Sequence, residues 1–435
     1  MNRLVLRISL ILSTLAAGAF LTAARAQEPD FSKYPNPEFA KMIYERPWMA
    51  NLNACPYEMA VQPGPQTRAP RGYKPFYISH YGRHGARSGW DQEKFEAIIG
   101  ALSAAKEAGI LTASGDSLMN EVTLVKIATN KMDGRLTVRG QREHRAIANR
   151  MYRNFRRVFR RGSKNIRALS STVPRCLVSM AAFTNQLSEL DYRLNIVMDC
   201  GEEIQKEITN DSPREDRPAR YHITDSLRHS MGVDYSGMMS RLFTDTTAAR
   251  QFVPVPRYLA RDIFGIGRIS RSFDYDFNIF RFLPFDAVYG WADYNNLSMY
   301  LGQCNSLLFG DNRMARTKPL VDLIVRQADE AISSGEVAAD LHFGHDYPLM
   351  ALCSYLGIEG CAERYDVEGA RQHYITTLVA PFAGNLQIIF YRSRKADKPV
   401  LVKFLLNENE VRLLDLEPVQ GPYYSWEALR EKISR

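Results

Sequence analysis

The hydrophobic pattern of the chain contains three short apolar runs, and each ends at a polar, turn-forming segment that leads into a helix. The first run covers about 74–79 and breaks at the glycine-bearing segment 81–87. The second covers 165–169, and a cluster of Ser and Thr before a Pro then provides a helix start. The third covers 340–343, and 344–346 follows it before an amphipathic helix. Three strand-to-helix junctions are therefore predicted.

These junctions carry six side chains that are suited to chemistry. They are Arg83, His84, Arg87, Arg175, His345 and Asp346. In an open α/β sheet such junctions converge at the carboxyl ends of the strands, where ligands bind, so we expect the six to surround one crevice. The pattern predicts an α/β fold with a mainly parallel central sheet flanked by helices.

Other segments complete this core. Residues 136–161 form a long amphipathic helix that Gly162 ends. Nearer the C-terminus, 386–391 is a strand candidate, and 400–406 with 411–414 predicts a hairpin.

Between 191 and 316 the pattern loosens into short helical and loop segments rich in Arg, Asp and aromatic residues. That stretch is long enough to form a mostly helical cap that closes over the crevice. We therefore predict an α/β core made of 27–190 and 317–435, with a cap inserted at 191–316, which agrees with a length sufficient for two or three units.

The N-terminus is typical of an export signal. Arg3 and Arg7 precede an uncharged apolar run over 8–24, which is shorter than the ~20 residues that a spanning helix needs. The small residues around Arg25 form a signal-peptidase site, so 1–26 is predicted to be a signal peptide. An uncleaved membrane anchor is the alternative. No second long apolar run follows, so we expect no membrane span after cleavage and a periplasmic or extracellular location.

Composition and charge further restrict the class of protein and the kind of ligand it binds. Hydrophobic residues make up 45% and charged residues 24%, which excludes disordered, collagenous and coiled-coil chains. The net charge of +8 favours anionic ligands without requiring nucleic acid. The arginines of 136–161 could form a nucleic-acid or membrane-surface face. Their spread opposite an apolar stripe, without aromatic residues to stack bases, favours a solvated core helix and no nucleic-acid partner.

The six cysteines form an even set in an exported chain, so disulfides are expected, with pairing left open. They are Cys55, Cys176, Cys200, Cys304, Cys353 and Cys361. Cys353 and Cys361 are close enough in sequence for a local bridge, whereas Cys176 and Cys353 could equally be buried free thiols. No Cys-x-x-Cys pair is present, which argues against a structural zinc site.

The six junction residues suit phosphoryl transfer. Arginine presents a planar fork that matches phosphate oxygens, so three arginines in one pocket favour a phosphoryl group. A histidine beside them can attack phosphorus, and the cations help to keep its imidazole neutral. Asp346 is placed to protonate the leaving group. No metal-ligand cluster is visible, so neither a metal nor another cofactor is expected.

The motifs at these junctions resemble those of the histidine acid phosphatases. Arg83-His84-Gly85-Ala86-Arg87 is similar to their nucleophile motif, and His345-Asp346 to their proton-donor pair. The segments 134–140 and 170–175 are similar to two further elements of the family, in the family's order. The resemblance implies that His84 is the nucleophile and Asp346 the acid, that Arg83, Arg87, Arg175 and His345 bind phosphate, and that a helical cap is present.

Two positions depart from the family pattern. Gly89 stands where Pro, Ala or Ser is usual, which should loosen the turn. The donor pair is His-Asp, whereas the multiple inositol polyphosphate phosphatase branch, which the overall layout also resembles, typically has a glutamate after the His and one intervening residue. The subfamily and the substrate are therefore left open.

The sequence favours an exported phosphomonoesterase that hydrolyses small organic phosphates, with inositol polyphosphates or sugar phosphates as candidate substrates. Each site residue also has a structural explanation, such as a helix N-cap for Asp346 or a turn role for His84. Three junctions that carry complementary pieces of one site argue against those explanations. The alternative is a non-catalytic phosphate-ligand binding protein that retains the pocket. The sequence leaves the oligomeric state undetermined.

Overall fold

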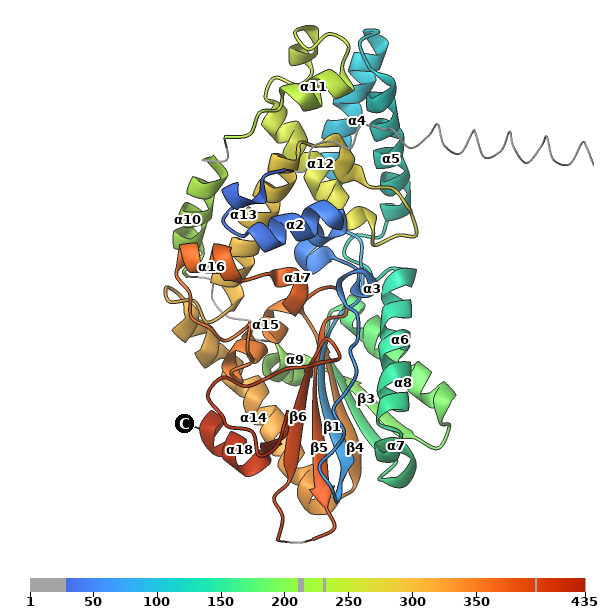
Figure 1. The fold of residues 1–435 in the computed structure, drawn as a ribbon. Helices are drawn as coiled ribbons and strands as arrows, with labels where there is room; N and C mark the ends of the chain where they lie inside the picture. The colour runs from blue at the N-terminus through green and yellow to red at the C-terminus, as the bar shows by residue number, and fades with distance from the viewer. Residues whose placement is uncertain (1–28, 210–214, 230–231, 396, 435) are drawn as a thin grey trace, which may run out of the picture.

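One eight-stranded sheet forms the base of the molecule (Figure 1). The computed structural model describes residues 29–209, 215–229, 232–395 and 397–434. The strand order is β3-β2-β4-β1-β5-β6-β7, and β8 pairs with β6. The strands are β1 (Tyr73–Arg83), β2 (Asn165–Ser170), β3 (Asn195–Cys200), β4 (Val337–Gly344), β5 (Asn385–Ser393), β6 (Leu401–Leu406), β7 (Asn409–Glu410) and β8 (Tyr424–Ser425). Five of the six strand segments expected around the core are present. The sixth, 411–414, is not a strand: the return arm of the predicted hairpin is the two-residue β7, and Leu413 forms only an isolated bridge with Ile358.

The sheet has a parallel half and an antiparallel half. From β3 through β2 and β4 to β1 all neighbours are parallel, whereas β5, β6, β7 and β8 pair antiparallel. The predicted α/β class is confirmed, and the parallel half contains the three predicted junctions. In register, Arg83 lies opposite Gly344, and Ser170 lies opposite Phe343. The three strands therefore end at the same edge, so the residues that follow them are brought together.

Helices cover both faces of the sheet. The helices α6 (Val138–Asn154), α7 (Arg156–Arg161) and α8 (Pro174–Leu190) share one apolar core with the sheet. The helices α14 (Gly310–Ser334), α15 (Asp346–Tyr355) and α18 (Trp426–Ser434) share a second core on the opposite face. Side chains alternate between the faces, since Tyr77 joins the second core and Ile78 the first. The helix expected over 136–161 is two helices, with Phe155 non-helical between them.

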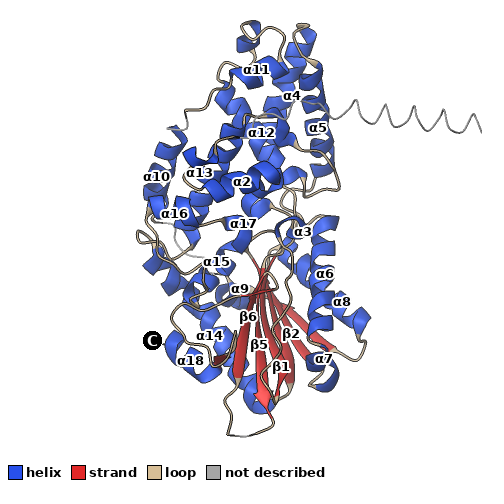
Figure 2. Cartoon of the chain, viewed as in Figure 1, coloured by secondary structure: helices blue, strands red, loops and turns tan. Residues whose placement is uncertain are grey.

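A separate helical body lies beyond the carboxyl edge of the sheet (Figure 2). Its apolar core is built from α2 (Pro37–Glu45), η2 (Pro47–Ala54), α4 (Gln92–Glu107), α5 (Ala113–Thr129), α11 (Ser236–Leu242), α12 (Pro256–Ser270), η4 (Ile279–Phe282) and α13 (Phe285–Gln303). The remaining helices are η1 (Phe31–Lys33), α3 (Tyr57–Ala60), α9 (Glu202–Ile208), α10 (Arg217–His229), η3 (Ala248–Gln251), α16 (Val367–His373) and α17 (Thr376–Val379).

The helical body does not coincide with the predicted insertion at 191–316. Its helices α4 and α5 precede that segment, whereas β3 lies inside the segment and forms the edge strand beside β2. The helix α9 also packs against α14 of the core. The reason is physical: an amphipathic pattern shows that a helix buries one face, but it does not show which neighbour covers that face.

The described cysteines are all free thiols, so the disulfide prediction is not supported. Five of them are buried and behave as small apolar side chains, and only Cys200 is exposed. The predicted signal peptide, 1–26, lies outside the described residues. Within the described ranges, no helix is both long enough and apolar enough to cross a bilayer.

Candidate active site

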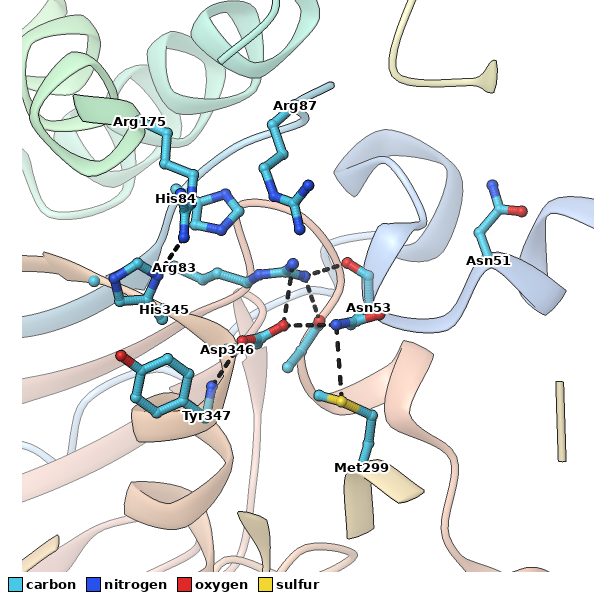
Figure 3. A network of polar contacts seen from close by, with 12 residues as sticks. Asn51, Asn53, Arg83, His84, Arg87, Arg175, Met299, His345, Asp346 and Tyr347 are labelled. Carbon is cyan, nitrogen blue, oxygen red and sulfur yellow. Dashed lines mark hydrogen bonds and ion pairs between the residues drawn. The ribbon is translucent and has the colours of Figure 1, made fainter. Parts of the chain in front are cut away.

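The six predicted site residues meet at the carboxyl edge of the parallel half-sheet (Figure 3). Arg83 ends β1, and His84 and Arg87 follow it in the turn 83–87, which we call the nucleophile loop. Arg175 lies in the first turn of α8, and the His345-Asp346 pair connects β4 to α15. Backbone bonds tie the junctions to one another: the His84 N–H donates to the Gly344 carbonyl oxygen at 2.9 Å.

His84 is a buried imidazole in its neutral form. Its side chain is 2% exposed, and its Nδ1 lies 2.9 Å from the carbonyl oxygen of Gly85. Because a carbonyl oxygen only accepts, Nδ1 carries the proton and the lone pair resides on Nε2. Burial lowers the pKa of His84 well below its usual range, and the charges of Arg83, Arg87 and Arg175 lower it further.

Three guanidinium groups surround this imidazole (Figure 3). The Nε atoms of Arg83, Arg87 and Arg175 are buried and have no hydrogen-bond partner among the described residues. Burial and the other two arginines lower the pKa of Arg87 to about 10. Like charges held close together, with buried donors that lack a partner, are costly, so the cluster is suited to bind an anion that pairs with all three.

Trp90 forms an aromatic wall beside two of these arginines. Its ring centroid lies 4.5 Å from the Arg87 guanidinium carbon and 5.7 Å from that of Arg175. The indole is 59% exposed, and it occupies space beside Gly134, where a Cβ would overlap it. Cation–π contact holds the guanidinium groups without consuming their N–H donors. No sequence pattern singles out this tryptophan.

His345 is held on several sides. Its Nε2 lies 3.3 Å from Ser171 Oγ, and its Nδ1 lies 3.4 Å from Arg175 Nη2. The ring stacks on Tyr347 at 5.1 Å and lies 5.7 Å from the His84 ring, centroid to centroid. This imidazole therefore borders the same space as His84 and Arg175.

Asp346 faces the cluster as a carboxylate. Its Oδ2 lies 3.2 Å from Arg83 Nη2 and accepts a hydrogen bond of 2.6 Å from Asn53 Nδ2, while its Oδ1 accepts from the Tyr347 N–H. Burial alone would raise the pKa of Asp346. The charge of Arg83 and the Asn53 hydrogen bond outweigh that effect and lower it to about 2. Without a ligand this carboxyl group is therefore ionised.

Asn53, like Trp90, is a site residue that the sequence analysis missed. It lies in η2, where its Oδ1 accepts 2.6 Å from Arg268 Nη2 of α12 while its Nδ2 donates to Asp346. Its carbonyl oxygen also accepts from Arg83. The preceding Leu52 has a φ of 56°, in the left-handed region that non-glycine residues rarely adopt. No motif marks Asn53, because it approaches Asp346 from 293 positions away.

The first turn of α6 supports the nucleophile loop. The Thr137 N–H and hydroxyl both donate to the Ala86 carbonyl oxygen, and Glu143 accepts from the N–H groups of Ala86 and Tyr57. A Cβ on Gly140 would lie 2.3 Å from the Ala86 carbonyl oxygen, so only glycine permits this approach. The motif 134–140 therefore positions the loop.

Two further histidines near the site, His80 and His342, lie in the core. His342 Nδ1 lies 2.9 Å from the His80 carbonyl oxygen, and its Nε2 lies 2.9 Å from Gln327 Oε1, so His342 is a buried, hydrogen-bonded ring. The His80 ring packs against Phe183 and Phe343. In the part of the chain that the structure describes, no group of three or more His, Cys, Asp or Glu side chains could hold a metal ion.

Comparison with solved structures identifies the fold. The multiple inositol polyphosphate phosphatase of Bifidobacterium longum, solved with phosphate, superposes with a TM-score of 0.72 at 17% identity, over 89% of this chain and 97% of that one. The same protein with inositol hexasulfate gives 0.71 at 18% identity, over 88% and 97%. The phytase of D. castellii gives 0.66 at 13% identity, over 89% and 84%.

The chain has the histidine acid phosphatase fold. This confirms, at the level of fold, the resemblance drawn from the motifs at 83–87 and 345–346. In sequence, no family model and no curated protein matches the chain.

Proposed function

We propose that the protein is a phosphomonoesterase that forms a covalent phosphohistidine on His84, with Asp346 as the proton donor. The observation that carries the proposal is the set of three arginines, each with a buried and unpaired Nε atom, around one neutral imidazole. Arg83, Arg87 and Arg175 would bind the phosphoryl oxygens, and His345 would add a contact beside Arg175.

The first chemical step transfers the phosphoryl group to the protein. The lone pair on His84 Nε2 attacks phosphorus, an N–P bond forms, and the P–O ester bond breaks. The departing oxygen takes a proton from Asp346 and leaves as an alcohol. Arg83, Arg87 and Arg175 stabilise the charge on the remaining phosphoryl oxygens.

The second step releases phosphate. The Asp346 carboxylate takes a proton from a water molecule as the water oxygen attacks phosphorus. The N–P bond breaks and its electron pair returns to Nε2, so His84 is neutral and Asp346 is protonated again.

Substrate binding would favour the protonated form of Asp346. In the free protein Asp346 is ionised because Arg83 and Asn53 stabilise its charge. A phosphoryl dianion would compete for Arg83 and add negative charge beside the carboxylate, and both effects raise the pKa of Asp346. The proton donor would thus form when a substrate is present.

Inositol polyphosphates are the substrate class that we propose. The solved structures that share the fold include an inositol polyphosphate phosphatase and a phytase. In this chain Arg268 adds a further cation from the helical body, close enough to lower the pKa of Arg87. A cationic site with walls from two parts of the fold suits a ligand that carries several phosphates.

Phosphate release from a panel of esters tests both parts of this proposal. We expect release from an aryl phosphate and from inositol hexakisphosphate, and acid-labile phosphate trapped on the wild type but not on His84→Ala. The exposed His373 provides a matched control, since His373→Ala should retain both signals. A protein that binds phosphate yet hydrolyses no ester would instead be the non-catalytic binding protein. Turnover of sugar phosphates alone would reject the inositol substrate.

We also propose that the protein is exported. The support is the sequence of 1–26, and cell fractionation with N-terminal sequencing tests it. A mature chain beginning at Gln27 outside the cytoplasm is expected, and a chain retaining Met1 in the cytoplasm would contradict it.

A further inference from the structure

A groove lined entirely by arginines lies at the opposite end of the sheet from the active site. Its lining residues are Arg156, Arg157, Arg160 and Arg161 of α7 and Arg193, which lies between α8 and β3. We call it the α7 arginine groove. Its volume is about 490 Å³, within the range of about 300–1,000 Å³ that is typical of small-ligand sites.

The fold separates this groove from the catalytic pocket. The helix α7 precedes β2 and Arg193 precedes β3, so the groove lies at the amino ends of these strands, whereas the active site lies at the carboxyl ends. The six residues of β2 span about 20 Å. Figure 1 shows α7 at the end of the sheet away from α15.

The charge of the four α7 arginines in the groove is uncompensated. Within the described ranges, none of the four α7 arginines forms a hydrogen bond or an ion pair with an acidic side chain, and no carboxylate lines the groove. The neighbouring α6 behaves differently, since Arg142 pairs with Asp274 and Arg150 with Glu408. The arginines of α6 are therefore explained as a solvated helix face. The same explanation does not account for the α7 arginines, which have no acidic partner and line a concave surface.

Arg193 forms a fixed edge of the groove. Its Nε and Nη2 bind the two carboxylate oxygens of Asp191 at 2.7 and 2.8 Å, and Asp191 also lies 3.9 Å from Lys164. The guanidinium of Arg193 is thereby oriented while its side chain stays 49% exposed. The break at Phe155 places α7 in a separate helix whose Val158 and Phe159 are buried, which directs its arginines to the surface.

We propose that the α7 arginine groove is a second binding site, specific for ligands that carry clustered phosphate groups. Guanidinium forks bind phosphate oxygens in pairs, and several forks around one hollow select a ligand with more than one phosphate. A free polyphosphorylated molecule and a phospholipid headgroup share this chemistry. The site does not depend on the catalytic role proposed for His84.

Calorimetric titration with inositol hexasulfate tests the proposal. This polyanion carries clustered sulfate groups in place of the phosphates of inositol hexakisphosphate. We expect two sites on the wild type, of which the triple variant Arg156→Gln, Arg157→Gln, Arg160→Gln weakens one by at least about tenfold. The matched control replaces three exposed arginines outside the groove, Arg68, Arg71 and Arg412, with Gln. It loses the same charge and should keep both sites. Turnover of an aryl phosphate should be unchanged in both triple variants.

A second experiment distinguishes a phospholipid headgroup from a free polyphosphorylated molecule as the ligand. Sedimentation with vesicles of phosphatidylglycerol and phosphatidylcholine, lost only in the groove variant, assigns a lipid headgroup. Hexasulfate binding without vesicle binding assigns a free ligand. Should the groove variant unfold, the Arg→Lys triple at the same positions keeps the charge and removes the forks. Hexasulfate binding that the groove variant leaves unchanged, equal losses in the two Gln triples, or tighter binding of duplex DNA than of either probe would overturn the proposal. A single wild-type site that only the groove variant loses would support the groove and count against hexasulfate binding in the catalytic pocket.

Discussion

At the scale of single residues, the proposed chemistry depends on how neighbouring charges set two protonation states. His84 is kept neutral by burial and by three cations, so it remains a nucleophile in acid. Asp346 is kept ionised by Arg83 and Asn53, with a pKa lowered to about 2 although burial acts in the other direction. The same cations thus favour the neutral, nucleophilic form of His84 and oppose the protonated, acidic form of Asp346. A bound anion would offset the cations and so raise the pKa of Asp346.

Removing the acid should affect esters according to their leaving group. In Asp346→Asn the alkoxide departs unprotonated, so hydrolysis of an alkyl phosphate should fall by about 10² to 10⁴, whereas an aryl phosphate should lose far less. Steady-state kinetics on both esters measures the difference. Equal losses on the two esters would contradict the assignment of Asp346.

Removing Asn53 should shift the pH profile. Asn53→Ala deletes a hydrogen bond that favours the ionised carboxylate, so the pKa of Asp346 rises and the alkaline decline of kcat/KM for an alkyl phosphate moves to higher pH. The control is Asn295→Ala, because Asn295 accepts from Arg268 and does not contact Asp346. An unchanged profile in Asn53→Ala would show that this residue does not position the acid.

At the scale of elements, the nucleophile loop depends on a close backbone approach to the first turn of α6. Gly85 and Gly140 face each other with no room for a Cβ, and Thr137 and Glu143 bind Ala86 from the same helix. The position of His84 is therefore set partly by a helix that carries no catalytic residue.

A methyl group at Gly140 should displace the loop. Gly140→Ala places a Cβ 2.3 Å from the Ala86 carbonyl oxygen, which is backbone and cannot rotate away. We expect kcat to fall by about 10²-fold, the cost of displacing a catalytic group by about 1 Å, and the free energy of unfolding to fall by about 1–3 kcal/mol. Gly100→Ala in α4, where a Cβ meets nothing within 4 Å, should leave kcat unchanged. Normal kcat in Gly140→Ala would exclude this role.

Glu143 should make stability depend on pH. Burial raises its pKa from 4.5 to about 7, so between these values the folded state binds a proton that the unfolded state releases. The contribution of this group to the free energy of unfolding therefore falls by about 3 kcal/mol as the pH rises from 4.5 to 7. Urea unfolding across this range should show a shallower decline in Glu143→Gln. If the free energy of unfolding depended on pH in the same way in both proteins, the raised pKa of Glu143 would be contradicted.

At the scale of the whole molecule, the site exists only because three strands end at one edge and the helical body supplies the facing wall. Arg83, Arg175 and Asp346 belong to separate junctions, and Arg268 reaches Asn53 from α12. The three arginines repel one another without a ligand, so an anion that pairs with them should stabilise the entire fold.

Inorganic phosphate should therefore raise the unfolding temperature. At a concentration of about one hundred times Kd, binding adds about 2.7 kcal/mol to the free energy of unfolding. Arg175→Gln should lose this gain, whereas the exposed Arg412→Gln should keep it. A gain of the same size in Arg175→Gln would show that phosphate binds elsewhere.

The sequence alone determined the parts of the protein that local rules govern. Short apolar runs marked β1, β2 and β4, and the polar residues after them supplied Arg83, His84, Arg87, Arg175, His345 and Asp346. Periodicity and turn residues are local signals, so strands and junctions follow from them. Because parallel strands align their carboxyl ends, the convergence of these six side chains could also be predicted.

Only the tertiary structure decided what depends on contacts between distant segments. It placed α4 and α5 in the helical body and β3 in the sheet, brought Asn53 and Arg268 to Asp346, and collected the α7 arginines with Arg193 around one groove. It also left Asp346 ionised in the absence of a ligand. The physical reason is the same in each case: burial, packing partners and the pKa of a buried group depend on what lies nearby in space, which sequence distance does not encode.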